Sequence, residues 1–171
     1  MRHPLSRKIT LVVLFGVLVF VSKIFIPTPF DKMAIAVQAI LLAMGFLSIG
    51  PLGATYVAGV GGVLSAVWRA PFAPFTLLLA FTYGLLMDVL CYAFRVKRSD
   101  SSIRKGMLVC AVTLATVVTG LFSYYLTIFV FALLPRNLFV ELAILAAGTL
   151  NGLVAGFLTP VLWSRVARYL L

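Results

Sequence analysis

The segment "SIGPLGATYVAGVGGVLSAVW" (residues 48–68) is apolar but has almost no large side chains at its centre. Ala54, Ala58, Gly62 and Ala66 recur every four residues, so they share one face of a helix, here called the small-residue face. In lipid, close approach between small residues favours helix association, whereas burial of apolar area does not. The segment therefore predicts a thin helix that lies against another helix, either within the chain or in a partner protein.

The composition of the chain is that of an integral membrane protein. It has 171 residues, of which 63% are hydrophobic and 11% charged, and its mean hydropathy is +1.17. A soluble domain has about 45–50% apolar and about 25% charged residues. The length suits a single membrane domain over residues 1–171.

Six segments are apolar enough to be membrane spans, since a helix needs about 20 mostly apolar residues to cross a bilayer. They predict an all-α bundle of six transmembrane helices. The second and third segments are short, so they could also form a merged or partly re-entrant pair. The predicted spans are residues 9–27, 33–49, 51–68, 72–94, 106–134 and 138–164.

The basic residues predict the orientation, because lysine and arginine concentrate in cytoplasmic loops. Six spans place both termini and the 95–105 loop on one side. That side carries ten cations: Arg2, Arg7, Lys8, Arg95, Lys97, Arg98, Arg104, Lys105, Arg165 and Arg168. The other side carries four: Lys23, Lys32, Arg69 and Arg136. We expect the chain to lie in the plasma membrane with both termini on the cytoplasmic side. The net charge of +10 is then explained by this topology and by contact with anionic lipid headgroups rather than by binding of nucleic acid.

The sequence lacks the residue patterns that several kinds of enzymatic and metal chemistry require. The sequence has no GxxxxGK[ST] loop, no HExxH and no Gly-x-Ser-x-Gly. His3 is the only histidine, and Cys91 and Cys110 form no zinc pattern. We expect no enzymatic activity, no metal and no cofactor. The spans also lack a series of Lys and Asp residues that could relay protons. We therefore expect the chain to bind a molecule from outside the cell but not to supply the energy for its transport.

Polar residues within the spans are candidates for function, because such groups are costly in a membrane. Aromatic side chains with a few convergent polar groups predict a small-molecule pocket in the outer half, with Lys23 nearby and Asn151 as its floor. The candidate substrate-binding residues are Gln38, Trp68, Arg69, Thr76, Tyr124, Tyr125, Glu141 and Asn151. On the fifth span, a polar stripe predicts a polar interior: Thr113, Thr116, Gly120, Ser123 and Thr127.

Some of these groups have alternative roles. Arg69 could hold an anionic or aromatic ligand, or it could fix the helix end to lipid phosphates. Glu141 could pair with Arg136 or favour the helix N-terminus. Asp88, near the cytoplasmic end of the fourth span, is expected to pair with a basic residue such as Arg95.

The segment "IPTPFDKMAIAVQAILLAMGFLSIGPLGATYVAGVGGVLSA" (26–66) has a proline-containing loop, a span with Ala and Gln, and a Gly-Pro-x-Gly-Ala turn before a glycine-rich span. With six spans, an outer pocket and no energy source, the chain resembles the substrate-binding (S) component of energy-coupling factor (ECF) transporters, which import vitamins into prokaryotes.

The resemblance implies a vitamin-like substrate and three partner chains: a membrane coupling (T) component and two cytosolic ATPases. It also implies that the S component topples in the membrane to release its substrate, and that its first three helices face the T component through small residues. The family's Ala-x-x-x-Ala feature is absent from the first span, which offers only Gly16. The expected interface is therefore Gly16, Ala54, Ala58, Gly62 and Ala66.

Two alternatives remain open. In the first, the chain is a ligand-free structural subunit of a larger membrane complex, and the small-residue faces are protein contacts. In the second, it is a membrane enzyme acting on lipid headgroups, for which Asp88 and Asp100 lie near the cytoplasmic cations.

Overall fold

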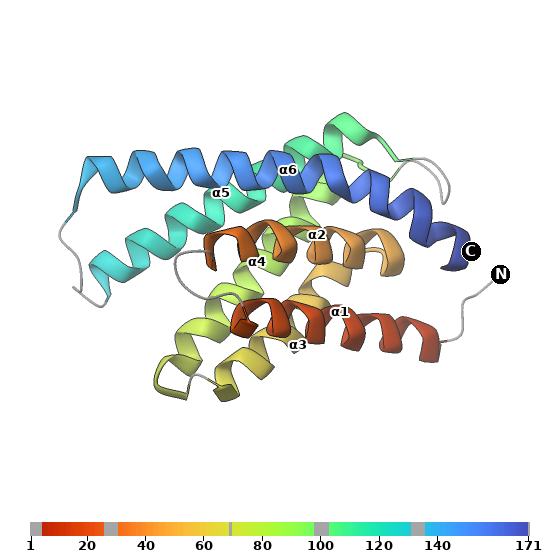
Figure 1. Cartoon of the computed structure of the whole chain (residues 1–171), viewed down its shortest axis with the longest axis horizontal. Coiled ribbons are helices and arrows are strands. Elements are labelled where there is room, and N and C mark those ends of the chain that lie inside the picture. The colour runs from red at the N-terminus through yellow and green to blue at the C-terminus, as the bar shows by residue number, and fades with distance from the viewer. Residues whose placement is uncertain (1–4, 26–30, 69, 98–102, 131–135, 171) are drawn as a thin grey trace.

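A computed structural model describes residues 5–25, 31–68, 70–97, 103–130 and 136–170. Over these residues the chain forms six α-helices and one short 3-10 helix, which confirms the predicted all-α bundle of six helices (Figure 1). The elements are α1 (Leu5–Phe25), α2 (Asp31–Ile49), α3 (Gly53–Trp68), η1 (Ala70–Phe72), α4 (Ala73–Ala93), α5 (Lys105–Phe129) and α6 (Leu138–Leu170).

The helices differ in how far they can reach across a membrane. Within the described part of the chain, three stretches are long and apolar enough to span it: Ala73–Ala93, Lys105–Phe129 and Leu138–Arg165. Two shorter apolar helices cover Ala34–Ile49 and Gly53–Trp68.

A tight turn separates α2 from α3, so the two helices are not merged. Gly50 has a φ of 100°, in the left-handed region that glycine adopts without strain. Its nitrogen donates to Phe46 O at 2.9 Å, as in a helix C-cap, and its carbonyl accepts from Gly53 N at 3.0 Å. A Cβ added to Gly53 would collide with the carbonyl oxygen of Gly45, so the start of α3 requires glycine to lie against the end of α2.

The small-residue face of α3 lies against α4. A Cβ added to Gly84 of α4 would come within 2.6 Å of Ala58 Cβ, and one added to Gly62 of α3 would come within 2.6 Å of Ala80 Cβ. Such distances mean that the two backbones approach as closely as Ala and Gly side chains permit.

A second close contact joins α3 to α1. A Cβ added to Gly16 would come within 2.6 Å of Val60 Cγ1, and one added to Gly61 would come within 2.8 Å of Val19 Cγ1. The helix is thin because it packs between α1 and α4 of its own chain.

The residues expected at a partner interface therefore lie inside the chain: Gly16, Ala54, Ala58, Gly62 and Ala66 are all buried. Gly16 contacts α3, and Ala54, Ala58 and Gly62 contact α4, which corrects the expectation that this face is available to a T component. The exposed side of α3 carries larger side chains, among them Tyr56, Val63 and Val67.

The bundle is packed unevenly along its length. The first turn of α1 and the last turn of α6 lie at the same end, and we call that half the terminal half and the opposite one the distal half (Figure 1). The terminal half holds fully buried side chains from the end of α2, the end of α4 and the start of α5, namely Leu42, Leu47, Met87, Cys91, Leu108 and Val112.

The basic connection between α4 and α5 is attached to this core. Val96 is completely buried, and its carbonyl accepts a hydrogen bond from Arg104 N at 3.0 Å. Lys97 and Ile103 form an isolated antiparallel bridge next to it. Both ends of the connection are therefore anchored to the terminal half.

Asp88 does not form the expected ion pair with Arg95. Its Oδ1 accepts from Ala54 N at 3.1 Å, and its Oδ2 accepts from Thr55 N at 2.7 Å and from Thr55 Oγ1 at 2.6 Å. The first N–H groups of a helix lack partners within that helix and carry partial positive charge. A carboxylate on α4 satisfies two of them for α3, which explains why Asp88 is buried.

Candidate functional site

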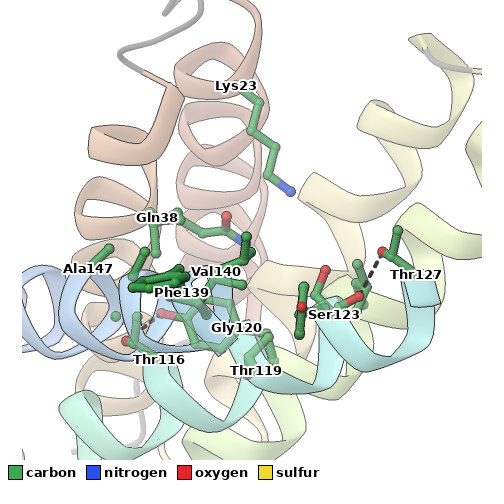
Figure 2. Close-up of a pocket in the computed structure, with 17 residues that line it drawn as sticks. Lys23, Gln38, Thr116, Thr119, Gly120, Ser123, Thr127, Phe139, Val140 and Ala147 are labelled. Atoms are coloured by element: carbon green, nitrogen blue, oxygen red, sulfur yellow. Dashed lines mark hydrogen bonds between the residues drawn. The ribbon is translucent and has the colours of Figure 1, made fainter. Parts of the chain in front are cut away.

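A cavity of about 660 Å³ lies in the distal half, between α1, α2, α4, α5 and α6 (Figure 2). Its size is within the range of about 300–1,000 Å³ found for small-molecule sites. The lining residues are Lys23, Ile35, Gln38, Leu79, Tyr83, Thr116, Thr119, Gly120, Ser123, Tyr124, Thr127, Phe139, Val140, Ala143, Ile144, Ala147 and Gly148.

Helix α5 supplies the polar wall of the cavity. Four members of the predicted polar stripe line it: Thr116, Gly120, Ser123 and Thr127. Thr113, the fifth member, lies deeper, and its hydroxyl is buried without a hydrogen-bond partner. The spacing of three and four residues therefore identified the face of α5 that turns inward.

Helix α6 can lie close to α5 because three glycines face it. A Cβ added to Gly152 would come within 2.5 Å of Thr113 Cα, and one added to Gly156 would come within 2.7 Å of Val109 Cα. At Gly148, which lines the cavity, the corresponding distance to Val117 Cα is 3.3 Å. Gly148 lets α6 lie close to α5 at the cavity, and Gly152 and Gly156 do so nearer the terminal half.

The start of α6 is held by a polar contact with α5. The Tyr124 hydroxyl donates to Asn137 O at 3.2 Å and accepts from Asn137 N at 3.1 Å. Asn137 Oδ1 in turn accepts from Phe139 N at 2.9 Å, which caps the helix. Tyr124 therefore presents its ring to the cavity while its hydroxyl positions the helix opposite.

Several other polar groups of the wall are already occupied. Thr116 Oγ1 donates to Val112 O at 2.8 Å, so the hydrogen shared between Tyr83 and Thr116, 3.0 Å apart, comes from the Tyr83 hydroxyl. Thr127 Oγ1 donates to Ser123 O at 2.8 Å. Back-bonding of this kind reduces the polarity that threonine shows to a ligand.

Other polar groups of the lining are Gln38, Thr119, Ser123 and Lys23. The Gln38 side chain is buried, and its amide makes no hydrogen bond within the described part of the chain. Thr119 Oγ1 is buried without a partner. Lys23 enters from α1 and is the one lysine, arginine, aspartate or glutamate among the described residues that line the cavity. Figure 2 shows Lys23 and Gln38 entering from the α1 and α2 side, across from Thr119.

Of the residues predicted to bind substrate, Gln38 and Tyr124 line the cavity. Arg69 lies outside the described residues. Trp68 is 66% exposed at the end of α3, and Thr76 lies about one turn beyond the lining residue Leu79 on α4. Neither lines the cavity.

The remaining three predicted residues also lie outside the lining. Tyr125 packs against the rings of Tyr124 and Phe129, with centroid distances of 5.6 and 6.2 Å. Asn151 is on the same face of α6 as Gly148 but one turn deeper. Glu141 Oε1 accepts from Arg136 Nε at 3.0 Å. This hydrogen bond and the charge of Glu141 raise the pKa of Arg136, and the pairing is one that the sequence had offered as an alternative.

Sequence reasoning did not select Tyr83 or Thr119. Tyr83 follows Leu79 by four residues, so the two share a face of α4, and this spacing was the available signal. Thr119 lies outside the regular spacing of the polar stripe, one residue from Gly120. The lack of a large side chain at Gly120 leaves room for the cavity beside it.

No protein-family model and no curated protein sequence matches the chain. Among solved structures, its fold is similar to one described as "Structure and mechanism of the S component of a bacterial ECF transporter". The TM-score is 0.71 at 15% sequence identity, and the alignment covers 98% of this chain and 99% of that chain. The similarity extends over the whole chain, so the six helices have the arrangement of an ECF S component.

Proposed function

We propose that the chain is the substrate-binding membrane subunit of an ATP-driven importer of the ECF type, which takes up a vitamin or similar micronutrient. The observation that carries the proposal is the cavity of about 660 Å³ in the distal half of a bundle with the fold of an S component. The bias of lysine and arginine towards the terminal half favours a cytoplasmic location for that half. The cavity would then receive its substrate from outside the cell.

The energy for uptake would come from other proteins, since the sequence offers no nucleotide-binding loop. The resemblance supplies a T component and two cytosolic ATPases. The small-residue face is buried, so contact with a T component falls to the outward side of the first three helices. That side includes Val13 and Val17 on α1, one turn apart, and Val63 and Val67 on α3, also one turn apart.

The test is native mass spectrometry of the chain purified alone in detergent after growth in rich medium. We expect a stoichiometric small-molecule adduct. Ala147→Phe places a ring in the cavity and should abolish the adduct. Ala146→Phe, on the exposed side of α6 one residue away, should retain it. Absence of an adduct from the wild type, with no thermal stabilisation by any member of a vitamin panel, would contradict the proposal.

The structure weakens both alternatives. A ligand-free structural subunit was suggested by small-residue faces available to partner proteins, but Ala58 and Gly62 contact α4 of the same chain. A headgroup-processing enzyme would have used Asp88, whose carboxylate caps α3. Its second candidate, Asp100, lies outside the described residues.

A further inference from the structure

We propose that the ligand of this cavity carries an amide-type group, in which an N–H lies beside a carbonyl oxygen, and that this group pairs with the side-chain amide of Gln38. Lactams, ureides, imides and primary amides all contain such a group. The inference rests on the proposed function and names the class of molecule that the same site takes. It follows from the position of Gln38 in the cavity and from its unused hydrogen-bonding groups.

The first argument is that Gln38 lies at the inner end of the cavity. On α2, α4 and α5, the lining nearest the terminal half consists of Gln38, Tyr83 and Thr116. One turn further towards the terminal half, each of these helices carries a fully buried core residue, namely Leu42, Met87 and Val112. A ligand that fills the cavity therefore brings one edge against the side chains of the inner end.

The second argument is that the polar groups of Gln38 are unused, whereas those of its neighbours at the inner end are not. The Tyr83 hydroxyl lies 3.0 Å from Thr116 Oγ1, which itself donates to Val112 O at 2.8 Å. Gln38 is only 8% exposed, and its amide forms no hydrogen bond to any residue that the structure describes. Figure 2 shows its side chain extending from α2 into the cavity, across from Thr119 of α5. Since buried amides are nearly always hydrogen-bonded, the partner of this one is a molecule that enters the cavity.

The third argument is the chemistry that an amide requires of its partner. The Gln38 side chain presents an accepting carbonyl oxygen and a donating NH₂ group next to each other. Water can serve both groups, and a ligand that displaces this water has to serve both as well, because a buried polar group without a partner is costly. An amide-type group does so with two parallel hydrogen bonds. Its N–H donates to Gln38 Oε1, and its carbonyl oxygen accepts from Gln38 Nε2.

Other ligand groups complete only part of this pairing. A carboxylate accepts from Nε2 but places a second acceptor against Oε1, and a ketone or an ether has no donor for Oε1. Two neighbouring hydroxyls of a sugar could serve both atoms. The other hydroxyls of the sugar would then face a wall that includes the apolar side chains of Leu79, Phe139 and Ile144. Burial of hydroxyls against such side chains is unfavourable, so a sugar is a poorer match than a mainly apolar molecule with one amide-type edge.

The experiment compares compounds that have the N–H with derivatives in which methyl groups replace its hydrogen. The pairs are biotin and biotin methylated on a ureido nitrogen, riboflavin and riboflavin methylated on the imide nitrogen, and nicotinamide and its N,N-dimethyl derivative. Each compound is added to the purified full chain in detergent, and the apparent Kd is obtained from the rise in Tm with concentration. We expect at least one parent compound to bind at least tenfold more tightly than its methylated derivative.

Variants of Gln38 separate hydrogen bonding from the steric effect of the methyl group. Gln38→Met keeps the length of the side chain but not its hydrogen bonds, so it should weaken the parent compound at least tenfold and the methylated derivative much less. Gln38→Asn keeps a shorter amide and should retain part of the preference. Thr127→Val is the matched control, because the Thr127 hydroxyl lines the cavity but already donates to Ser123 O, and it should leave the preference unchanged. If Gln38→Met does not fold, the preference of Gln38→Asn relative to Thr127→Val decides the matter.

Three results overturn the proposal: no parent compound stabilises the chain, each parent that binds is matched by its methylated derivative, or Gln38→Met keeps the wild-type preference. These results are separable from failure of the proposed function. An adduct that Ala147→Phe abolishes but that has no N–H beside a carbonyl would refute the amide-type group and support the binding subunit. A chain that binds no small molecule would refute both.

Discussion

Asp88 of α4 accepts two hydrogen bonds from Thr55 of α3, at 2.7 Å from the backbone nitrogen and 2.6 Å from the hydroxyl. The two residues are 33 positions apart, and the contact joins the start of α3 to the last turns of α4. In hydrocarbon an unpaired backbone group is costly, and a short helix that begins inside the bundle needs such an external partner. Asp88 therefore fixes where α3 begins and how it lies on α4.

Replacement of Asp88 should destabilise the chain in a graded way. Asp88→Leu leaves two backbone N–H groups and one hydroxyl unpaired, and we expect a loss of about 2–4 kcal/mol, since hydrogen bonds to charged groups contribute about 1.5–3 kcal/mol each and are not additive. Asp88→Asn keeps one acceptor oxygen and should cost about half as much. Denaturation in mixed micelles measures the order, and an Asn variant less stable than the Leu variant would contradict this account.

Close packing of α3 on α4 predicts a strong effect at Gly84. A Cβ there would lie 2.6 Å from Ala58 Cβ and 2.8 Å from Thr55 Cα, so the backbones would have to separate. Gly84→Val should destabilise the chain by about 3 kcal/mol or more, the upper range for overpacking. Gly106→Val, at a glycine of α5 with open space around its Cα, is the matched control, and equal loss of Tm in the two variants would refute the packing argument.

Loss of the Tyr124 hydroxyl should loosen the start of α6. Tyr124→Phe removes the donor to Asn137 O and the acceptor for Asn137 N, for an expected cost of about 1–2 kcal/mol. Hydrogen exchange of the amides of residues 137–141 should become faster, while exchange in α2 is unchanged. Tyr92→Phe, at a largely exposed tyrosine, is the control, and unchanged exchange in both variants would show that the contact holds nothing in place.

The orientation of the bundle can be tested with single cysteines in a chain that carries Cys91→Ala and Cys110→Ala. A membrane-impermeant maleimide added to intact cells should label Arg136→Cys in the distal half and should not label Arg104→Cys in the terminal half. Both positions are exposed, so both should react once the membrane is permeabilised. Labelling of Arg104→Cys alone in intact cells would reverse the assignment of the two faces.

The ends of the helices could be predicted from the sequence wherever glycine or proline interrupts the apolar pattern. Gly50 and Pro51 mark the turn between α2 and α3, and the predicted start of the last span, residue 138, is the first residue of α6. Its predicted end, residue 164, fell short, since α6 continues to Leu170. Hydropathy marks where a helix leaves the apolar layer, and a helix with cations after that point can continue into water.

The neighbours of a helix were harder to predict than its ends. Repeated small residues showed that α3 is approached closely, but the pattern is the same for a neighbour within the chain and for a partner protein. Only the positions of Gly84 and Ala80 on α4 decide between them. The interface residues were misplaced for this reason.

The lining of the cavity was predicted in part, for a similar reason. Periodicity identified the inward face of α5, and the cost of a buried amide identified Gln38. The chemistry of a single residue does not show how deep it lies along the bundle axis or which way it faces on its helix. Trp68 and Asn151 therefore lie outside a cavity whose depth the sequence did not reveal.

The filled terminal half has a consequence for the cell that carries the protein. Leu42, Leu47, Met87, Leu108 and Val112 are fully buried below the cavity and give ions no chain of polar groups to follow. Such a bundle can remain in the membrane at any copy number without dissipating a proton or sodium gradient. A membrane that carries many copies of the bundle therefore keeps its ion gradients whether the cavity is empty or filled.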